Sequence, residues 1–195
     1  MAIWWNLQLP AWLMENSPRI RIGLAAFACF LASIPLANWM VQHIGTVCVP
    51  DGPCLVPVAP GLLAPSGVLT VGAALVLRDV VQRCLGLSWG LAAIAAGTLL
   101  SSLIALPALV LASGTAFALS ELADCGVYTP LQRRRLTLAV VASSVVGLVV
   151  DSVVFLFLAF GSLDFLAGQV VGKLWAVLVA VPLVRLLRRV APTPA

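Results

Sequence analysis

Charge is the scarcest property of this chain. Only 9% of its 195 residues are Asp, Glu, Lys or Arg, whereas 62% are hydrophobic. A soluble domain carries about 25% charged residues, so the composition excludes a soluble globular fold and indicates an integral membrane protein. The formal net charge of +4 does not indicate a nucleic-acid partner, because arginines concentrate in the cytoplasmic loops of membrane proteins.

Residues that several kinds of catalysis need are also missing. The chain has one histidine, His43, so a metal site built on paired histidines, such as H-E-x-x-H, cannot form. The phosphate-loop pattern G-x-x-x-x-G-K-[ST] does not occur, which excludes ATP hydrolysis through this motif. We therefore expect a protein that is not an enzyme and needs no metal or cofactor.

The arginines that are present fall in four clusters, and consecutive clusters are separated by enough apolar sequence for two membrane crossings. The clusters are Arg19/Arg21, Arg78/Arg83, the run 133–135, and Arg185/Arg188/Arg189. If every cluster is cytoplasmic, the chain crosses the membrane and returns three times. This alternation predicts an all-α bundle of six transmembrane helices with both termini in the cytoplasm.

Apolar runs, prolines and glycines place the six predicted helices. We expect them at about 20–44, 62–84, 88–105, 107–126, 136–160 and 166–188. For the second helix, Pro65-Ser66-Gly67 is an alternative cap that would leave a shorter span. The residue before a proline disfavours helix, so Pro130 should end the fourth helix. The stretch 45–60 is predicted to be an external loop, and 189–195 a flexible tail.

The first 19 residues are predicted to lie outside the bundle. They have no basic stretch of the kind that begins a signal peptide, so we expect no cleavage. Trp4, Trp5 and Trp12 favour a segment at the level of the lipid headgroups, with an unstructured tail as the alternative. In the external loop, Cys48 and Cys54 either form a short disulfide or remain reduced, depending on the compartment.

Two charged residues are predicted to meet inside the membrane. Asp151 lies nine residues from the outer end of its helix and Lys173 seven, or about 14 Å and 10 Å deep at about 1.5 Å per residue. Buried charges usually face a partner or a cavity. Gln169 is one turn from Lys173, and Asn38 and Ser101 are at similar depth, so we predict a polar substrate pocket here. The alternative is an ion pair that only locks two helices together.

A second charged group is predicted nearer the cytoplasm. Arg78, Asp79 and Arg83 lie on the second helix, and Glu121 and Asp124 are i,i+3 neighbours on one face of the fourth. A partly buried ion pair between these helices is the simplest interpretation. The other is that Arg78, Asp79 and Asp124 form a gate or a proton-coupling site.

These same residues carry a resemblance to a known family. The segment 120–131 reads SELADCGVYTPL and is followed by arginines, and it resembles a hallmark of the queuosine-precursor transporter family, also called the vitamin uptake transporter (VUT) family. Weaker similarities span the rest of residues 60–175. They are LRDVVQR at 77–83 with Gly86, the stretch 144–152, and 160–162 with Gly168-Gln169 and Gly172-Lys173.

The resemblance implies a six-helix protein of the bacterial inner membrane that imports 7-cyano- or 7-aminomethyl-7-deazaguanine. The chemistry is compatible, because a carboxylate such as Asp151 or Glu121 can accept both donors on the edge of a deazaguanine. Asn38 and Gln169 could read the other edges. An aromatic ring could stack on the base, with Trp39, Phe155, Phe160 and Trp175 as candidates.

The resemblance leaves the energy source and the partners open. A stand-alone carrier would use a proton or ion gradient, with Glu121 or Asp124 titrating. A substrate-binding subunit of an importer of the energy-coupling-factor type would need partner ATPases. A non-transporting scaffold or assembly protein is the third alternative. In each case the lipid bilayer is a partner, and a homo-oligomer is compatible with the sequence.

Overall fold

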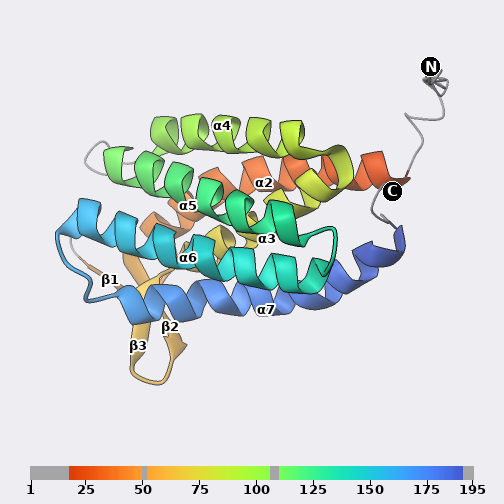
Figure 1. Ribbon diagram of the computed structural model, residues 1–195. Coiled ribbons are helices and arrows are strands. Elements are labelled where there is room, and N and C mark those ends of the chain that lie inside the picture. Colours follow the sequence, from red (N-terminus) through yellow and green to blue (C-terminus); the bar gives the residue numbers. More distant parts are fainter. Residues whose placement is uncertain (1–17, 50–51, 106–109, 191–195) are drawn as a thin grey trace, which may run out of the picture.

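The computed structural model of this protein describes residues 18–49, 52–105 and 110–190. Six helices run roughly side by side along one long axis (Figure 1). They are α2 (Pro18–His43), α3 (Val68–Leu85), α4 (Leu87–Ile104), α5 (Val110–Leu131), α6 (Leu136–Phe160) and α7 (Leu166–Val190). The interfacial segment and nearly all of the tail expected from the sequence, residues 1–17 and 191–195, lie outside the described residues.

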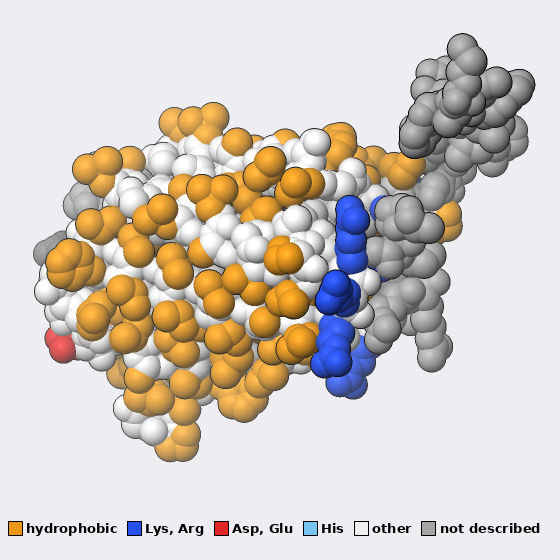
Figure 2. Space-filling view, in the orientation of Figure 1, with side chains coloured by type: hydrophobic (Ala, Val, Ile, Leu, Met, Phe, Trp, Pro, Cys, Tyr) orange, Lys and Arg blue, Asp and Glu red, His pale blue; other side chains and the backbone are white. Residues whose placement is uncertain are grey.

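Helix α3 is the centre of the bundle. It contacts all five other helices, and twelve of its 18 residues are buried, including Arg78, Asp79 and Arg83. The other helices turn apolar side chains outward, for example Leu103, Leu111 and Val179, and hydrophobic surface covers much of the face in Figure 2. A lipid-facing helix must be apolar, whereas α3 carries charge because its neighbours surround it.

Length and composition separate the helices into groups. Helices α2, α4, α5 and α6 are each long and apolar enough to cross a membrane, and α7 has a shorter apolar stretch over Leu166–Pro182. Helix α3 has 18 residues, or about 27 Å at about 1.5 Å per residue, close to the roughly 30 Å of hydrocarbon in a bilayer. Together these helices make the chain a multi-pass membrane protein.

The two ends of the bundle differ in charge. Arg19 donates hydrogen bonds to the carbonyls of Arg83 and Cys84, so the start of α2 and the end of α3 lie together. The exposed run 133–135 links α5 to α6 at this same end, and Figure 2 shows basic side chains, in blue, gathered there. We call it the arginine end. Asp164, also exposed, lies in the α6–α7 link at the opposite end.

A small sheet occupies the opposite end, where the sequence predicts a loop at 45–60 and a helix from 62. Strands β1 (Val47–Cys48), β2 (Cys54–Ala59) and β3 (Leu62–Pro65) form an antiparallel sheet in that order. Both predictions are wrong because the apolar residues of 54–65 pair as a hairpin around Gly61, whose φ of +74° suits glycine. The sheet end, as we call it, includes a disulfide between Cys48 and Cys54.

Helix α5 also differs from the prediction, because it continues past Pro130 to Leu131. A proline in the last turn removes only one helical hydrogen bond. The backbone N–H of Gln132 still reaches the carbonyl of Tyr128, and those of Arg134 and Arg135 reach the carbonyl of Leu131. The extra turn brings Thr129 within hydrogen-bonding distance of Gln82 on α3.

Candidate functional site

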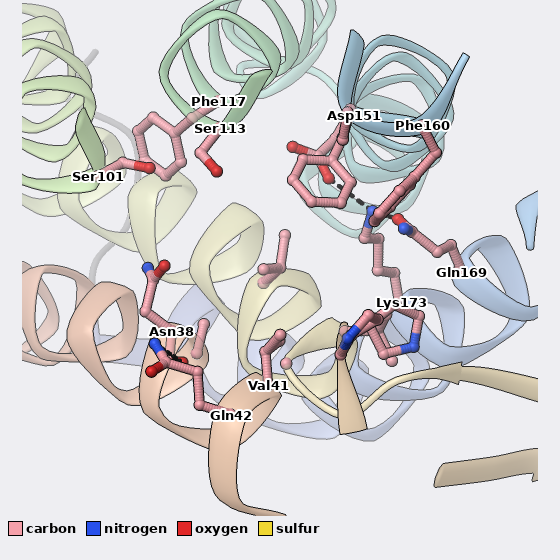
Figure 3. A pocket seen from close by; sticks show the side chains of 18 of the residues that line it. Asn38, Val41, Gln42, Ser101, Ser113, Phe117, Asp151, Phe160, Gln169 and Lys173 are labelled. Carbon is pink, nitrogen blue, oxygen red and sulfur yellow. Dashed lines mark hydrogen bonds and ion pairs between the residues drawn. The ribbon is translucent and has the colours of Figure 1, made fainter. Parts of the chain in front are cut away.

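A cavity of about 370 Å³ lies within the sheet-end half of the bundle. We call it the large cavity. Helices α2 to α7 all contribute to its wall, together with Gly52, Pro53 and Pro65 from the sheet region. Its polar lining is Asn38, Gln42, Ser101, Ser113, Asp151, Gln169 and Lys173, and its aromatic lining is Phe117, Phe155 and Phe160 (Figure 3).

Lys173 on α7 organises one wall of the large cavity. Its ammonium group donates three hydrogen bonds, to Asp151 Oδ2 at 2.5 Å, Gln169 Oε1 at 2.6 Å and Ser152 Oγ at 2.8 Å. An ammonium group has three donors, so all of them are used, and Lys173 is only 1% exposed. Lys173 therefore holds Asp151 and Gln169 in place and has no donor left for a ligand.

Asp151 and Gln169 keep polar atoms for the cavity. The Asp151 side chain is 13% exposed, and its second oxygen, Oδ1, accepts no hydrogen bond from the described residues. Gln169 uses only its carbonyl oxygen on Lys173, which leaves its amide N–H₂ as a donor. The wall thus offers a carboxylate acceptor beside an amide donor, and Lys173 neutralises the carboxylate charge.

The remaining walls add amides and rings. Asn38 on α2 spends one amide donor on the carbonyl of Ile34 and keeps its side-chain oxygen for the cavity. The rings of Phe155 and Phe160 lie edge to face, with centroids 6.0 Å apart and planes at 81°. A planar ligand entering this region would meet aromatic faces on one side and amide groups on the other.

Two of the aromatic candidates lie elsewhere. Trp39 stacks on His43 at the end of α2, and Trp175 donates its indole N–H to the carbonyl of Val58. Each is about half exposed, and neither lines the large cavity. Phe155 and Phe160 are the members of that candidate set that do, and Phe117 joins them although the sequence did not single it out.

The second charged group surrounds Arg78 and is completely buried. The Arg78 Nε donates to Glu121 Oε2 at 3.1 Å, and the Arg78 Nη2 donates to Asp124 Oδ1. The Arg78 Nη1 forms an ion pair with Asp79 Oδ1 at 3.0 Å. Arg78, Asp79 and Asp124 have no exposed side-chain surface, and Glu121 has 2%. We call these four residues the Arg78 cluster. The predicted ion pair between the second and fourth helices is confirmed.

Neutral polar residues that were not predicted to take part complete the Arg78 cluster. Gln82 accepts from Arg78 Nη1 and donates to Thr129. Ser143 on α6 donates to Asp79 Oδ2 at 3.1 Å, and the Tyr128 ring lies 5.7 Å from the guanidinium carbon. Each is a polar side chain within a membrane helix, a pattern that indicates a buried partner.

The predicted site residues therefore form two groups. Asn38, Asp151, Gln169 and Lys173 meet around the large cavity. Glu121 was also predicted to bind substrate, but it does not line the large cavity and is bonded to Arg78 instead. A second cavity of about 50 Å³, the small cavity, adjoins the large one and reaches Glu121.

Two patterns associated with catalysis, a serine elbow and a metal-binding group, can be checked against the structure. Residues 86–90 have the spacing G-x-S-x-G, which in hydrolases follows a strand; here it joins α3 to α4 at the arginine end. His43 ends α2 at the sheet end, so Ser88 and His43 do not meet. Among the described residues, no group of three or more His, Cys, Asp and Glu side chains could hold a metal ion.

Comparison with known proteins gives one match. Residues 101–188 match the model of a family described as putative vitamin uptake transporter. Searches of curated proteins and of solved structures give no match to the chain. The matched residues include α5, α6 and most of α7, and so contain Asp151, Gln169 and Lys173 as well as Glu121 and Asp124; the run 77–83 lies outside them. Over residues 101–188, this chain is similar to the family described as putative vitamin uptake transporter, which the motif at 120–131 also resembles.

Proposed function

We propose that this protein imports a small, planar, uncharged nitrogen heterocycle across the bacterial inner membrane, most specifically the queuosine precursor 7-cyano-7-deazaguanine. The family match supports a transporter of the vitamin-uptake type. The observation that carries the finer proposal is the wall of the large cavity, where Lys173 holds a carboxylate acceptor beside an amide donor.

The orientation of the chain follows from its charges. All six helices cross the bilayer in this proposal, and the arginine end faces the cytoplasm, because Lys and Arg favour that side. The sheet end then faces outward. Gln42, Gly52 and Phe160 are exposed lining residues of the large cavity near that end, so substrate enters from outside.

The donor and acceptor pattern of the wall complements a deazaguanine. The heterocycle presents a ring N–H and an exocyclic NH₂ side by side, and Asp151 Oδ1 accepts from them in a charge-assisted bond. Next to these donors the heterocycle carries a carbonyl, which accepts from the Gln169 amide. Phe155 and Phe160 offer ring faces and edges for the planar base.

The size of the large cavity fits such a ligand. Small-molecule sites usually measure roughly 300–1,000 Å³ and combine apolar surface with a few placed polar groups. The large cavity, at about 370 Å³, is at the small end of that range. A fused two-ring heterocycle is a ligand of suitable size, whereas a long-chain lipid would exceed the space.

Binding to the purified protein tests the proposal. We expect 7-cyano-7-deazaguanine to bind the wild-type protein in detergent, measured by calorimetry, and Asp151→Asn to weaken binding by about tenfold or more, since a charge-assisted hydrogen bond contributes roughly 1.5–3 kcal/mol. Asp164→Asn, which removes an exposed carboxylate outside the cavity, is the matched control and should bind normally. Binding that is equal in both variants would contradict the assignment of Asp151.

A further inference from the structure

The Arg78 cluster contains more acidic than basic groups, and its side chains are at most 2% exposed. Asp79, Glu121 and Asp124 contact one guanidinium. Even if Arg83, also buried on α3, is counted with Arg78, three carboxylates face two cations. An uncompensated charge buried within a membrane protein is costly. Protonation of one carboxylate would remove the excess negative charge of the cluster.

The three carboxylates differ in their access to the large cavity. Asp79 and Asp124 have no exposed side-chain surface and line neither cavity. Glu121 lines the small cavity, whose wall also contains Asp151, Asn38 and Ser101. These last three line the large cavity too, so the two cavities adjoin. Glu121 is the carboxylate of the cluster that a proton from the outer side can reach.

The small cavity is suited to water. Its volume is about 50 Å³, above the roughly 10–15 Å³ that one water needs, and water also requires polar partners. Besides the carboxylates, its wall includes the hydroxyls of Ser33, Ser101 and Ser120 and the Asn38 amide. Water here would connect Asp151 in the binding wall to Glu121 by hydrogen bonds.

The charged and titratable groups around Glu121 come from few elements. Helix α3 supplies Arg78 and Asp79, α5 itself supplies Asp124, Cys125 and Tyr128, and α6 supplies Asp151. Helix α4 has no charged residue. Arg78 is thus the one cation paired with Glu121 in the described residues, and this pair joins α3 to α5.

We infer that this protein is a proton symporter in which the Glu121 carboxylate carries the proton. The inference rests on the proposed function. A proton from outside reaches Glu121 through the two cavities and neutralises it, which breaks the Arg78–Glu121 ion pair between α3 and α5. Arg78 keeps Asp79 and Asp124 as partners. When the proton leaves to the cytoplasm, Glu121 is again ionised and the ion pair reforms.

The charge moved in each cycle follows from this scheme. The heterocycle is uncharged, so one proton per molecule carries one positive charge inward, and an inside-negative potential drives accumulation. The experiment uses the purified full chain in liposomes of phosphatidylethanolamine and phosphatidylglycerol, with a pH-sensitive dye inside. A potassium-diffusion potential makes the interior of the liposomes negative. Adding 7-cyano-7-deazaguanine to the outside should then acidify the interior in proportion to the substrate taken up.

Glu121→Gln tests the residue. It removes the titrating group and keeps the shape, so we expect exchange of labelled for unlabelled substrate to continue while acidification and potential-driven accumulation are lost. Asp164→Asn, an exposed carboxylate remote from the cluster, should retain both. A Glu121→Gln protein that acidifies the interior like wild type, or that lacks exchange, would overturn the assignment of Glu121.

Measurements on the wild type separate this inference from the proposed function. Exchange without acidification, or accumulation driven by a Na⁺ gradient at equal pH, would overturn proton coupling and leave the heterocycle importer standing. Absence of exchange would contradict the importer itself. The wild-type dye signal needs no variant, so proton coupling stays falsifiable even if Glu121→Gln fails to assemble.

Discussion

At the residue scale, Lys173 is the group that holds one wall of the large cavity in place. Its ammonium neutralises Asp151 and takes the Gln169 carbonyl, so it fixes two side chains while remaining 1% exposed. Replacing Lys173 by Met leaves Asp151 as a nearly buried charge without its cation. Breaking a buried ion pair in this way costs roughly 3–5 kcal/mol.

The first prediction separates stability from binding at this pair. Lys173→Met should lower the midpoint of thermal unfolding in detergent substantially, and the double variant Asp151→Asn/Lys173→Met should recover most of the loss, because both charges are then removed. Neither variant should bind the heterocycle at the wild-type affinity. A double variant that unfolds as early as Lys173→Met would contradict the ion-pair account.

The second prediction concerns the charge of the ligand. The large cavity holds one carboxylate and one ammonium, and these already pair. The amine of 7-aminomethyl-7-deazaguanine is protonated at neutral pH, and within this cavity it would be a buried cation without a free counter-ion. We expect 7-cyano-7-deazaguanine to compete for uptake at least tenfold better. Equal competition would show that the cavity does not discriminate by charge.

Part of the site is predictable from single residues. Depth along the helices brings Asp151 and Lys173 to one level, and their ion pair at 2.5 Å confirms it. Glu121 was predicted both beside Arg78 and in the substrate pocket. The structure places it with Arg78 and not in the wall of the large cavity, because depth alone does not tell which neighbour a side chain turns to. Ser152 and Gln82 were not assigned for the same reason, although both complete the bonding of a buried cation.

At the element scale, α3 is held closely against its neighbours. Gly72 faces α7 so tightly that a Cβ there would lie 2.5 Å from the carbonyl oxygen of Lys173. Small residues allow this approach, which van der Waals packing favours between membrane helices. Because the contact falls on Lys173 itself, the spacing of α3 and α7 also sets where the ammonium lies.

The third prediction uses this contact. Gly72→Ala should lower the unfolding midpoint and weaken substrate binding, since the added methyl group overpacks the α3–α7 contact at a cost of roughly 1–3 kcal/mol. Gly126→Ala on α5 is the matched control, because a Cβ there meets nothing within 4 Å; it should be neutral or slightly stabilising. If both variants unfold alike, the close contact does not limit stability.

Elements were predictable to different degrees. The helices have strong apolar runs, and five of the six begin and end within a few residues of their expected bounds, apart from the extra turn of α5. The sheet was missed because Pro57, Pro60 and Pro65 argue against strands. Proline is tolerated at bulges and on edge strands, and β2 has an irregularity between Pro57 and Ala59 while Pro65 ends the edge strand β3.

At the scale of the whole molecule, the proposed orientation rests on the difference between the two ends of the bundle. The arginine end and the sheet end lie at opposite ends of the six helices (Figures 1 and 2). The large cavity lies toward the sheet end and the Arg78 cluster toward the arginine end. A substrate moving inward would therefore pass from the cavity toward the buried ion pairs.

The fourth prediction tests this orientation. With Cys29, Cys84 and Cys125, the three free cysteines among the described residues, replaced by Ser, a membrane-impermeant maleimide should label Asp164→Cys in intact spheroplasts. Arg134→Cys should be labelled only after the membrane is opened, because the proposed orientation places its loop in the cytoplasm. The opposite labelling pattern would reverse the topology and place the large cavity on the cytoplasmic side.

The most direct test of import is complementation. The chain is expressed in a bacterium that can neither make nor import 7-deazaguanines, 7-cyano-7-deazaguanine is supplied at low concentration, and queuosine in tRNA is measured. We predict that wild type and Asp164→Asn restore queuosine and that Asp151→Asn does not. If the wild-type protein is present in the membrane and tRNA still lacks queuosine, this protein does not import that heterocycle, and the central claim is wrong.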